Sequence, residues 1–85
     1  MIYPYLTLKD ATEIVHSELK EDGKVMVYVE TPDAEKGFLH ATYWLPSLVW
    51  EDVYGYSEAQ IEYFTKLIHD NVRSIMAAAA DKNLL

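Results

Sequence analysis

Hydrophobic and polar residues alternate with a period of two in the middle of the chain. In residues 24–30, KVMVYVE, the three valines fall on one face, and Met26 and Tyr28 fall on the other. Residues 38–45, FLHATYWL, alternate in the same way, which predicts two strands because successive side chains of a strand point to opposite faces. Residues 31–37, TPDAEKG, contain the turn-forming residues of a loop between antiparallel strands. Since both faces of residues 24–30 are apolar, we expect a central strand there.

Two further segments predict additional strands. Residues 2–6, IYPYL, are rich in aromatic and aliphatic side chains, but Pro4 has no amide hydrogen for a ladder. This segment is therefore expected at a sheet edge or as a lead-in to the sheet. Residues 48–54 form a third β-rich run, between Pro46 and Gly55. Together these segments predict a sheet of three to four strands.

Apolar residues recur at helical spacing in residues 8–21, at positions Leu8, Ala11, Ile14, Val15 and Leu19. Thr7 is a residue type that caps helix N-termini, and Gly23 tolerates the left-handed conformation that often ends a helix. The spacing therefore predicts an amphipathic helix over residues 8–21.

A longer helix is predicted in the C-terminal part of the chain, from residue 58 to about residue 80. Ser57 and Gln60 form a capping box, in which each side chain satisfies a backbone amide of the other. The apolar stripe that follows consists of Ile61, Phe64, Leu67, Ile68, Ile75, Met76 and Ala79. Such a helix would measure about 35 Å, whereas a compact domain of this size is about 31 Å across. We therefore expect its end, with the Leu84–Leu85 tail, to overhang and to pack on a second copy as a homodimer.

These elements predict an α+β fold: a three- to four-stranded antiparallel sheet with an N-terminal amphipathic helix and a long C-terminal helix packed on one face. A chain of 85 residues without linkers or repeats is expected to form a single domain, residues 1–85. The longest uncharged run, residues 37–50, is interrupted by Pro46 and is too short to cross a bilayer. The N-terminal segment also lacks the pattern of a secretory signal. We therefore expect a cytoplasmic protein that does not bind membranes.

Charge narrows the possible partners. Fourteen acidic residues against seven basic ones give a formal net charge of -7. An acidic surface repels phosphate backbones, so we expect no direct binding of nucleic acid. The same field would steer the protein toward a basic protein partner. The absence of cysteine excludes disulfides, thiolate metal sites and cysteine nucleophiles, and it suits a reducing cytoplasm.

The polar residues show no pattern that fixes a chemistry. Glu13 and His16 have the Glu-x-x-His spacing of metal-binding helical bundles, but those sites need a second such motif, which is absent. His69 and Asp70 are adjacent on a predicted helix and therefore point in different directions. There is no Gly-x-Ser-x-Gly elbow, and three dispersed glycines cannot build a phosphate loop. We therefore expect no enzyme activity, no cofactor and no metal.

Aromatic residues are concentrated in residues 40–56, which hold five of the eleven aromatic side chains and both tryptophans. If helices cover only one face of the sheet, part of this aromatic surface faces solvent and suits a protein interface. The alternative is that all of these side chains belong to the core. The candidate partner-binding residues are Tyr28, Tyr43, Trp44, Trp50, Glu51, Asp52 and Tyr54.

Several of these features resemble the HicB-type antitoxin domain, over residues 24–70. They are Gly37–Phe38 at a strand entry, the Leu45–Pro46 corner with the segment to Glu51, and the capped helix that opens with Ser57-Glu58-Ala59. Ser47 stands where that family favours glycine. The resemblance implies a non-catalytic function, the masking of a small basic ribonuclease toxin.

Three functional hypotheses follow from the sequence. The first is a small acidic, non-catalytic protein-binding module, of which an antitoxin-like masker of a basic partner is one form. The second is a homodimeric scaffold or regulatory subunit whose long helix supplies the interface. The third is an acidic inhibitor that mimics nucleic acid.

Overall fold

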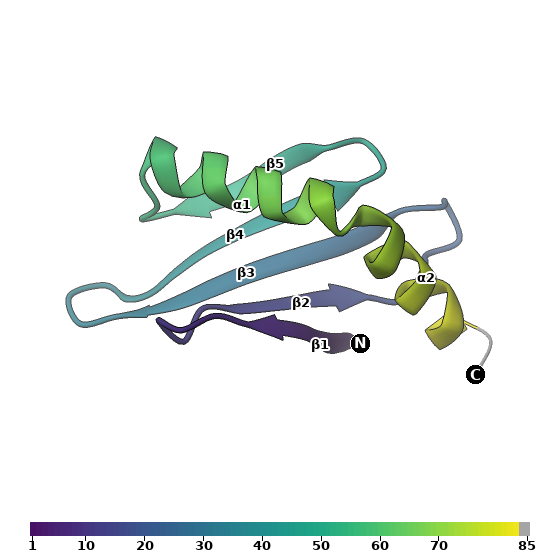
Figure 1. Ribbon diagram of the computed structural model, residues 1–85, viewed down its shortest axis with the longest axis horizontal. Helices are drawn as coiled ribbons and strands as arrows, with labels where there is room; N and C mark the ends of the chain where they lie inside the picture. The colour runs from purple at the N-terminus through teal and green to yellow at the C-terminus, as the bar shows by residue number, and fades with distance from the viewer. Residues whose placement is uncertain (84–85) are drawn as a thin grey trace.

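The fold consists of a five-stranded antiparallel sheet followed by two helices that lie against one of its faces (Figure 1). The computed structural model describes residues 1–83. The strands follow one another in space in the order of the sequence, so that β1 and β5 form the two edges. The elements are β1 (Ile2–Thr7), β2 (Glu13–Ser17), β3 (Val25–Asp33), β4 (Gly37–Leu45), β5 (Val49–Tyr54), α1 (Glu58–Asp70) and α2 (Val72–Asn83).

The strands predicted from alternation are confirmed. β3 is the central strand, and its three valines are completely buried on the face that the helices cover. The register pairs Val27 with Tyr43 and Val29 with Ala41, which places buried residues of β3 and β4 on the same face. The segment with Pro4 forms the edge strand β1, the position in a sheet where proline is tolerated, and the register shifts just after Pro4.

The predicted N-terminal helix over residues 8–21 is wrong, and the sheet accordingly has five strands rather than three to four. Residues 13–17 form β2, which pairs with β1 on one side and β3 on the other. Burial alternates along it: Ile14 and His16 are buried, whereas Val15 between them is only half-buried. A helix would have buried Ile14 and Val15 together, so pairing with β3 outweighs the helical spacing of the apolar residues.

The connection between β2 and β3 explains why this segment is a strand. Asp22 and Gly23 form a tight turn, in which Gly23 has a φ of +82° and Asp22 accepts a hydrogen bond from the Lys24 amide at 3.0 Å. The Lys20 amide donates to the Lys24 carbonyl at 2.9 Å and closes the hairpin. Gly23 therefore turns a hairpin and does not end a helix.

The C-terminal helical region begins as predicted but is divided into two helices. The capping box is confirmed: the Ser57 amide donates to Gln60 Oε1 at 2.8 Å, and the Gln60 amide donates to Ser57 Oγ at 3.2 Å. Asn71 interrupts the helix, with a φ of -117° and a ψ of 8°. Neither helix is long and apolar enough to cross a membrane, and this holds for all of residues 1–83.

The break at Asn71 directs α2 back onto the sheet. Ile75 and Ala79 of α2 are buried in the core, and the Leu19 amide donates to the Ala79 carbonyl at 3.1 Å. The predicted unbroken helix is therefore wrong, because the helical region is divided at Asn71, and Ile75 and Ala79 of its apolar stripe are buried by the same chain. Leu84 and Leu85, also part of that prediction, lie outside the described residues. Homodimerisation remains a prediction, without this support.

The core lies between the helices and the covered face of the sheet. The sheet contributes Ile14, Val25, Val27, Val29, Tyr43 and Leu45, and the helices contribute Phe64, Ile68, Ile75 and Ala79. All helical members of this cluster face the sheet. Within residues 1–83, no helix or strand packs on the other face of the sheet (Figure 1).

Candidate functional site

The face of the sheet that points away from the helices carries a mixed aromatic and acidic surface, which we call the open face. Its members follow from the strand registers, because they alternate with the buried residues that face the helices. They include Glu13, Val15, Met26, Tyr28, Glu30, Phe38, His40, Thr42, Trp44, Val49, Glu51 and Tyr54.

The registers of β3, β4 and β5 order most of the open face into three rows that run across the strands. The first row is apolar, and the other two combine aromatic rings with a carboxylate. The rows are Met26–Trp44–Val49, Tyr28–Thr42–Glu51 and Glu30–His40–Tyr54. Such a grid of rings and carboxylates on adjacent strands is fixed by the backbone and does not have to assemble on binding.

Three rings form a continuous stack across these strands. The centroids of Tyr28 and His40 lie 6.3 Å apart with their planes inclined by 24°, and those of His40 and Tyr54 lie 5.2 Å apart at 23°. Tyr28 and His40 are half-buried, whereas Tyr54 at the edge of the sheet is 47% exposed. The stack therefore leaves aromatic surface open to solvent at the β5 end.

Two carboxylates of the open face are held by aromatic donors. The Tyr28 hydroxyl donates to Glu30 Oε2 at 2.9 Å, and Trp44 Nε1 donates to Glu51 Oε2 at 3.0 Å. Burial, together with the hydrogen bond to Glu30 and the charge of Glu30, raises the pKa of Tyr28 to about 12. The hydroxyl therefore keeps its proton at neutral pH and remains a donor to Glu30.

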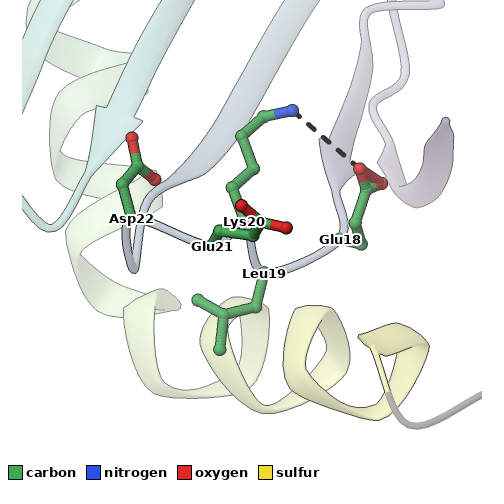
Figure 2. Close-up of a pocket in the computed structure, with 5 residues that line it drawn as sticks. All are labelled: Glu18, Leu19, Lys20, Glu21 and Asp22. Carbon is green, nitrogen blue, oxygen red and sulfur yellow. Dashed lines mark ion pairs between the residues drawn. The ribbon is translucent and has the colours of Figure 1, made fainter.

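The carboxylates of the open face have no basic partner in the described part of the chain. The two ion pairs within residues 1–83 both involve Glu18, with the N-terminal amine at 3.5 Å and with Lys20 Nζ at 3.9 Å. Glu18 and Lys20 belong to the loop after β2, where they line a hollow while Leu19 points toward α2 (Figure 2). The negative charge of Glu30 and Glu51 is thus left for a ligand or solvent to compensate.

Four of the seven residues predicted for partner binding lie on the open face: Tyr28, Trp44, Glu51 and Tyr54. A fifth, Asp52, is exposed at an irregularity of β5, where the register shifts and its φ is +52°. These five residues lie on neighbouring strands, so the structure brings them together on one surface.

The other two predicted residues, Tyr43 and Trp50, lie on the opposite face, under α1. Tyr43 is 2% exposed, and its hydroxyl lies 2.7 Å from Nε2 of His69, with which it shares a hydrogen bond. Trp50 is half-buried and packs on the core, and its Nε1 donates to Thr65 Oγ1 at 2.9 Å. Both residues join α1 to the sheet and are not available to a partner on the open face.

Sequence reasoning did not select Glu30 and His40, which complete the third row. The signal that could have found them is the period of two itself. Tyr43 and Trp44 are adjacent and therefore cannot share a face, whereas His40 and Trp44 are four residues apart and do share one. Glu30 follows Tyr28 by two residues and joins the same face for the same reason.

The polar pair noted in the sequence does not form a metal site. Glu13 is paired with Glu30 in the register and is exposed, whereas His16 is buried on the helix side. His16 Nδ1 donates to the Ser17 carbonyl at 2.8 Å. Among residues 1–83, no three His, Asp or Glu side chains are grouped as a metal ion would require.

Comparisons with known proteins supply no relative from which a function could be transferred. No protein-family model matches the chain, and neither the curated proteins nor the solved structures contain a significant match. The open face is therefore interpreted from its own geometry and charge.

Proposed function

We propose that this protein is a small, acidic, non-catalytic binding module that captures a basic protein on its open face. The observation that carries this proposal is the open face itself. It combines exposed and half-buried aromatic rings with carboxylates that have no basic partner among residues 1–83. Because the two helices lie on the other side of the sheet, a partner can approach this face without displacing any described element.

The aromatic content supports a protein partner. Tyrosine and tryptophan are enriched at protein interfaces, since they bury a large area and lose little conformational entropy. Tyr28 and Trp44 are already fixed by hydrogen bonds to Glu30 and Glu51. Binding would therefore order few additional side chains, which reduces one of the main costs of association.

The charge determines which kind of protein fits. A chain of net charge -7 attracts a basic partner over long range and repels acidic ones. A second copy would bring the carboxylates of two open faces, including Glu30 and Glu51, close to one another and remove them from water. That repulsion favours a basic protein over a second copy as the occupant, and nucleic acid is repelled for the same reason.

The resemblance to the HicB-type antitoxin domain supports a more specific form of the proposal. The resemblance covers residues 24–70, which contain β3, β4, β5 and α1. These three strands supply nearly all of the open face. In this form the basic partner is a small ribonuclease, and the open face inhibits it by covering its surface, without catalysing a reaction.

Affinity capture from a lysate of the source organism tests the proposal with two matched variants. The first, the open-face variant, carries Glu51→Lys and Asp52→Asn. Asparagine is chosen at position 52 because it suits the left-handed backbone there. The control makes the same change of charge on exposed positions of α1, with Glu62→Lys and Asp70→Asn. Captured proteins are identified by mass spectrometry and then purified for measurement of association rates.

We expect the wild type and the control to capture the same basic protein, and the open-face variant to associate with it about tenfold more slowly at low salt. The difference should shrink as ionic strength rises. Equal capture by both variants would contradict the proposal, and so would an acidic partner. A dimer of this chain that only the open-face variant disrupts would identify a second copy as the occupant instead.

A further inference from the structure

A shallow hollow on the open face extends over β3, β4 and β5, beside the irregularity in β5. It is lined by Tyr28, His40, Thr42, Asp52, Val53 and Tyr54. We infer that this hollow receives an arginine side chain of the basic partner. The inference rests on the proposed function and adds the group that the partner presents.

The irregularity in β5 builds this hollow. The register pairs Thr42 with Glu51 and His40 with Tyr54, so β5 has one residue more than β4 between these pairs. In a regular strand Tyr54 would face the helices, because it is three residues from Glu51. The extra residue turns Tyr54 onto the open face, where it stacks on His40, and leaves Asp52 at the rim of the hollow.

The backbone at Asp52 is compatible with this arrangement. Its φ of +52° lies in the left-handed region, which aspartate adopts more readily than most residues with a Cβ atom. The carboxylate of Asp52 is exposed and has no ion-pair partner among residues 1–83.

The rings favour a planar cation. Tyr28, His40 and Tyr54 lie nearly parallel, and the half-exposed ring of Tyr54 ends the stack. A guanidinium group stacks on such a ring as a further plane and is also attracted by its π-electrons. A lysine ammonium gains the charge attraction but cannot stack as a plane.

The carboxylates match the donors of arginine. Asp52 lines the hollow, and Glu30 lies beside His40 in the strand register. Glu30 Oε2 accepts from Tyr28, while Oε1 accepts no hydrogen bond within the described residues. A guanidinium group has five N–H donors in a plane and can therefore stack on a ring while it donates to a carboxylate at its edge.

Three synthetic peptides test the inference directly. They are identical, acetylated and amidated, with two glycines on each side of one central residue, which is arginine, lysine or citrulline. Citrulline keeps the planar shape but has no charge. Binding is followed by NMR through the ring protons of Tyr54 and His40 in the wild-type protein.

We expect the arginine peptide to bind at least about threefold more tightly than the lysine peptide, and the citrulline peptide to bind most weakly. In Tyr54→Leu the preference for arginine over lysine should disappear, because the apolar bulk remains but the ring is gone. Asp52→Asn should weaken both cationic peptides and reduce their advantage over citrulline. The controls Tyr63→Leu and Asp70→Asn, at exposed positions of α1, should bind like the wild type.

Equal binding of arginine and lysine peptides, or a preference that survives in Tyr54→Leu, would overturn the inference. If Tyr54→Leu does not fold, as judged by circular dichroism, Asp52→Asn carries the test. If the wild-type protein shows no preference for arginine but the open face still captures its partner in a charge-dependent way, the inference is rejected and the proposed function stands. If no cationic peptide perturbs the open face and both capture variants behave alike, both proposals fail.

Discussion

Replacing Tyr5 with phenylalanine and Asn71 with alanine, singly and together, tests the contact between β1 and the break in the helical region. The Tyr5 hydroxyl on β1 donates to Asn71 Oδ1 at 2.9 Å, and Asn71 Nδ2 donates to the Leu67 carbonyl at 2.8 Å. The Asn71 side chain thus satisfies a carbonyl in the last turn of α1 and also joins the end of this helix to the edge strand β1. If this contact fixes the bend, the two substitutions should not be additive.

The magnitude follows from the hydrogen bonds that each variant loses. Tyr5→Phe removes one bond between half-buried groups and should lower the free energy of unfolding by about 1 kcal/mol. Asn71→Ala removes two such bonds and should lower the free energy of unfolding by about 2 kcal/mol. The double variant should also lose about 2 kcal/mol, since Tyr5→Phe has nothing further to remove, which gives a coupling energy of about 1 kcal/mol.

Urea unfolding of the four proteins measures these values, and a loss of 1 kcal/mol should lower the melting temperature by about 4–8 °C in a domain of this size. Tyr3→Phe is the matched control. Tyr3 lies on the same strand and is half-buried, but its hydroxyl makes no hydrogen bond within residues 1–83, so its loss should stay within about 0.5 kcal/mol. Additive effects of the two substitutions would refute the reasoning, because they would show that Tyr5 and Asn71 act independently.

Three further predictions concern the sheet. Because the pKa of Tyr28 is about 12 when folded and 10.0 in the unfolded reference, its contribution to stability is complete below pH 10 and should be lost between pH 10 and pH 12. Alkaline unfolding curves of the wild type and Tyr28→Phe check this, and identical curves would contradict it. Gly55→Ala should destabilise more than Gly23→Ala in urea: both glycines have positive φ, but only at Gly55 would a Cβ atom meet another side chain, at 2.5 Å. Trp50→Ala should cost about 3 kcal/mol or more because its ring packs on the core, whereas Trp44→Ala should cost less in urea unfolding and instead weaken capture of the basic partner.

The strands of the central hairpin and the start of α1 could be predicted because local signals agree with tertiary contacts there. The valines of β3 alternate with Met26 and Tyr28, and the structure buries the valines completely. Ser57 and Gln60 form the predicted capping box, because both partners lie within one turn. Where the deciding interactions are this local, the sequence alone is sufficient.

β2 could not be found from apolar spacing, because its apolar residues fit the helical period of about 3.6 as well as the strand period of two. Ile14 and Val15 fit a helical stripe, and only the burial of His16 in place of Val15 reveals the strand. The stronger signal was the Asp22–Gly23 dipeptide, which is typical of a tight hairpin turn. At the break, Asn71 also accepts a hydrogen bond from Tyr5, 66 positions earlier in the chain, and no local pattern could indicate that contact.

The break at Asn71 and the uncovered open face are related, because both helices lie on the same face of the sheet. A straight helix from residue 58 onward would have left part of its apolar stripe beyond the sheet, free to bury other surfaces. With the break at Asn71, Ile75 and Ala79 are buried against the sheet together with Phe64 and Ile68 of α1, so the buried residues of both helices cover the same face. Nothing else among residues 1–83 is left to cover Tyr28, Trp44 and Tyr54, and any further burial of these rings has to come from outside the described residues. Mutations that straighten the helix should therefore change what the chain binds as well as how stable it is, which makes Asn71→Ala informative in the capture experiment too.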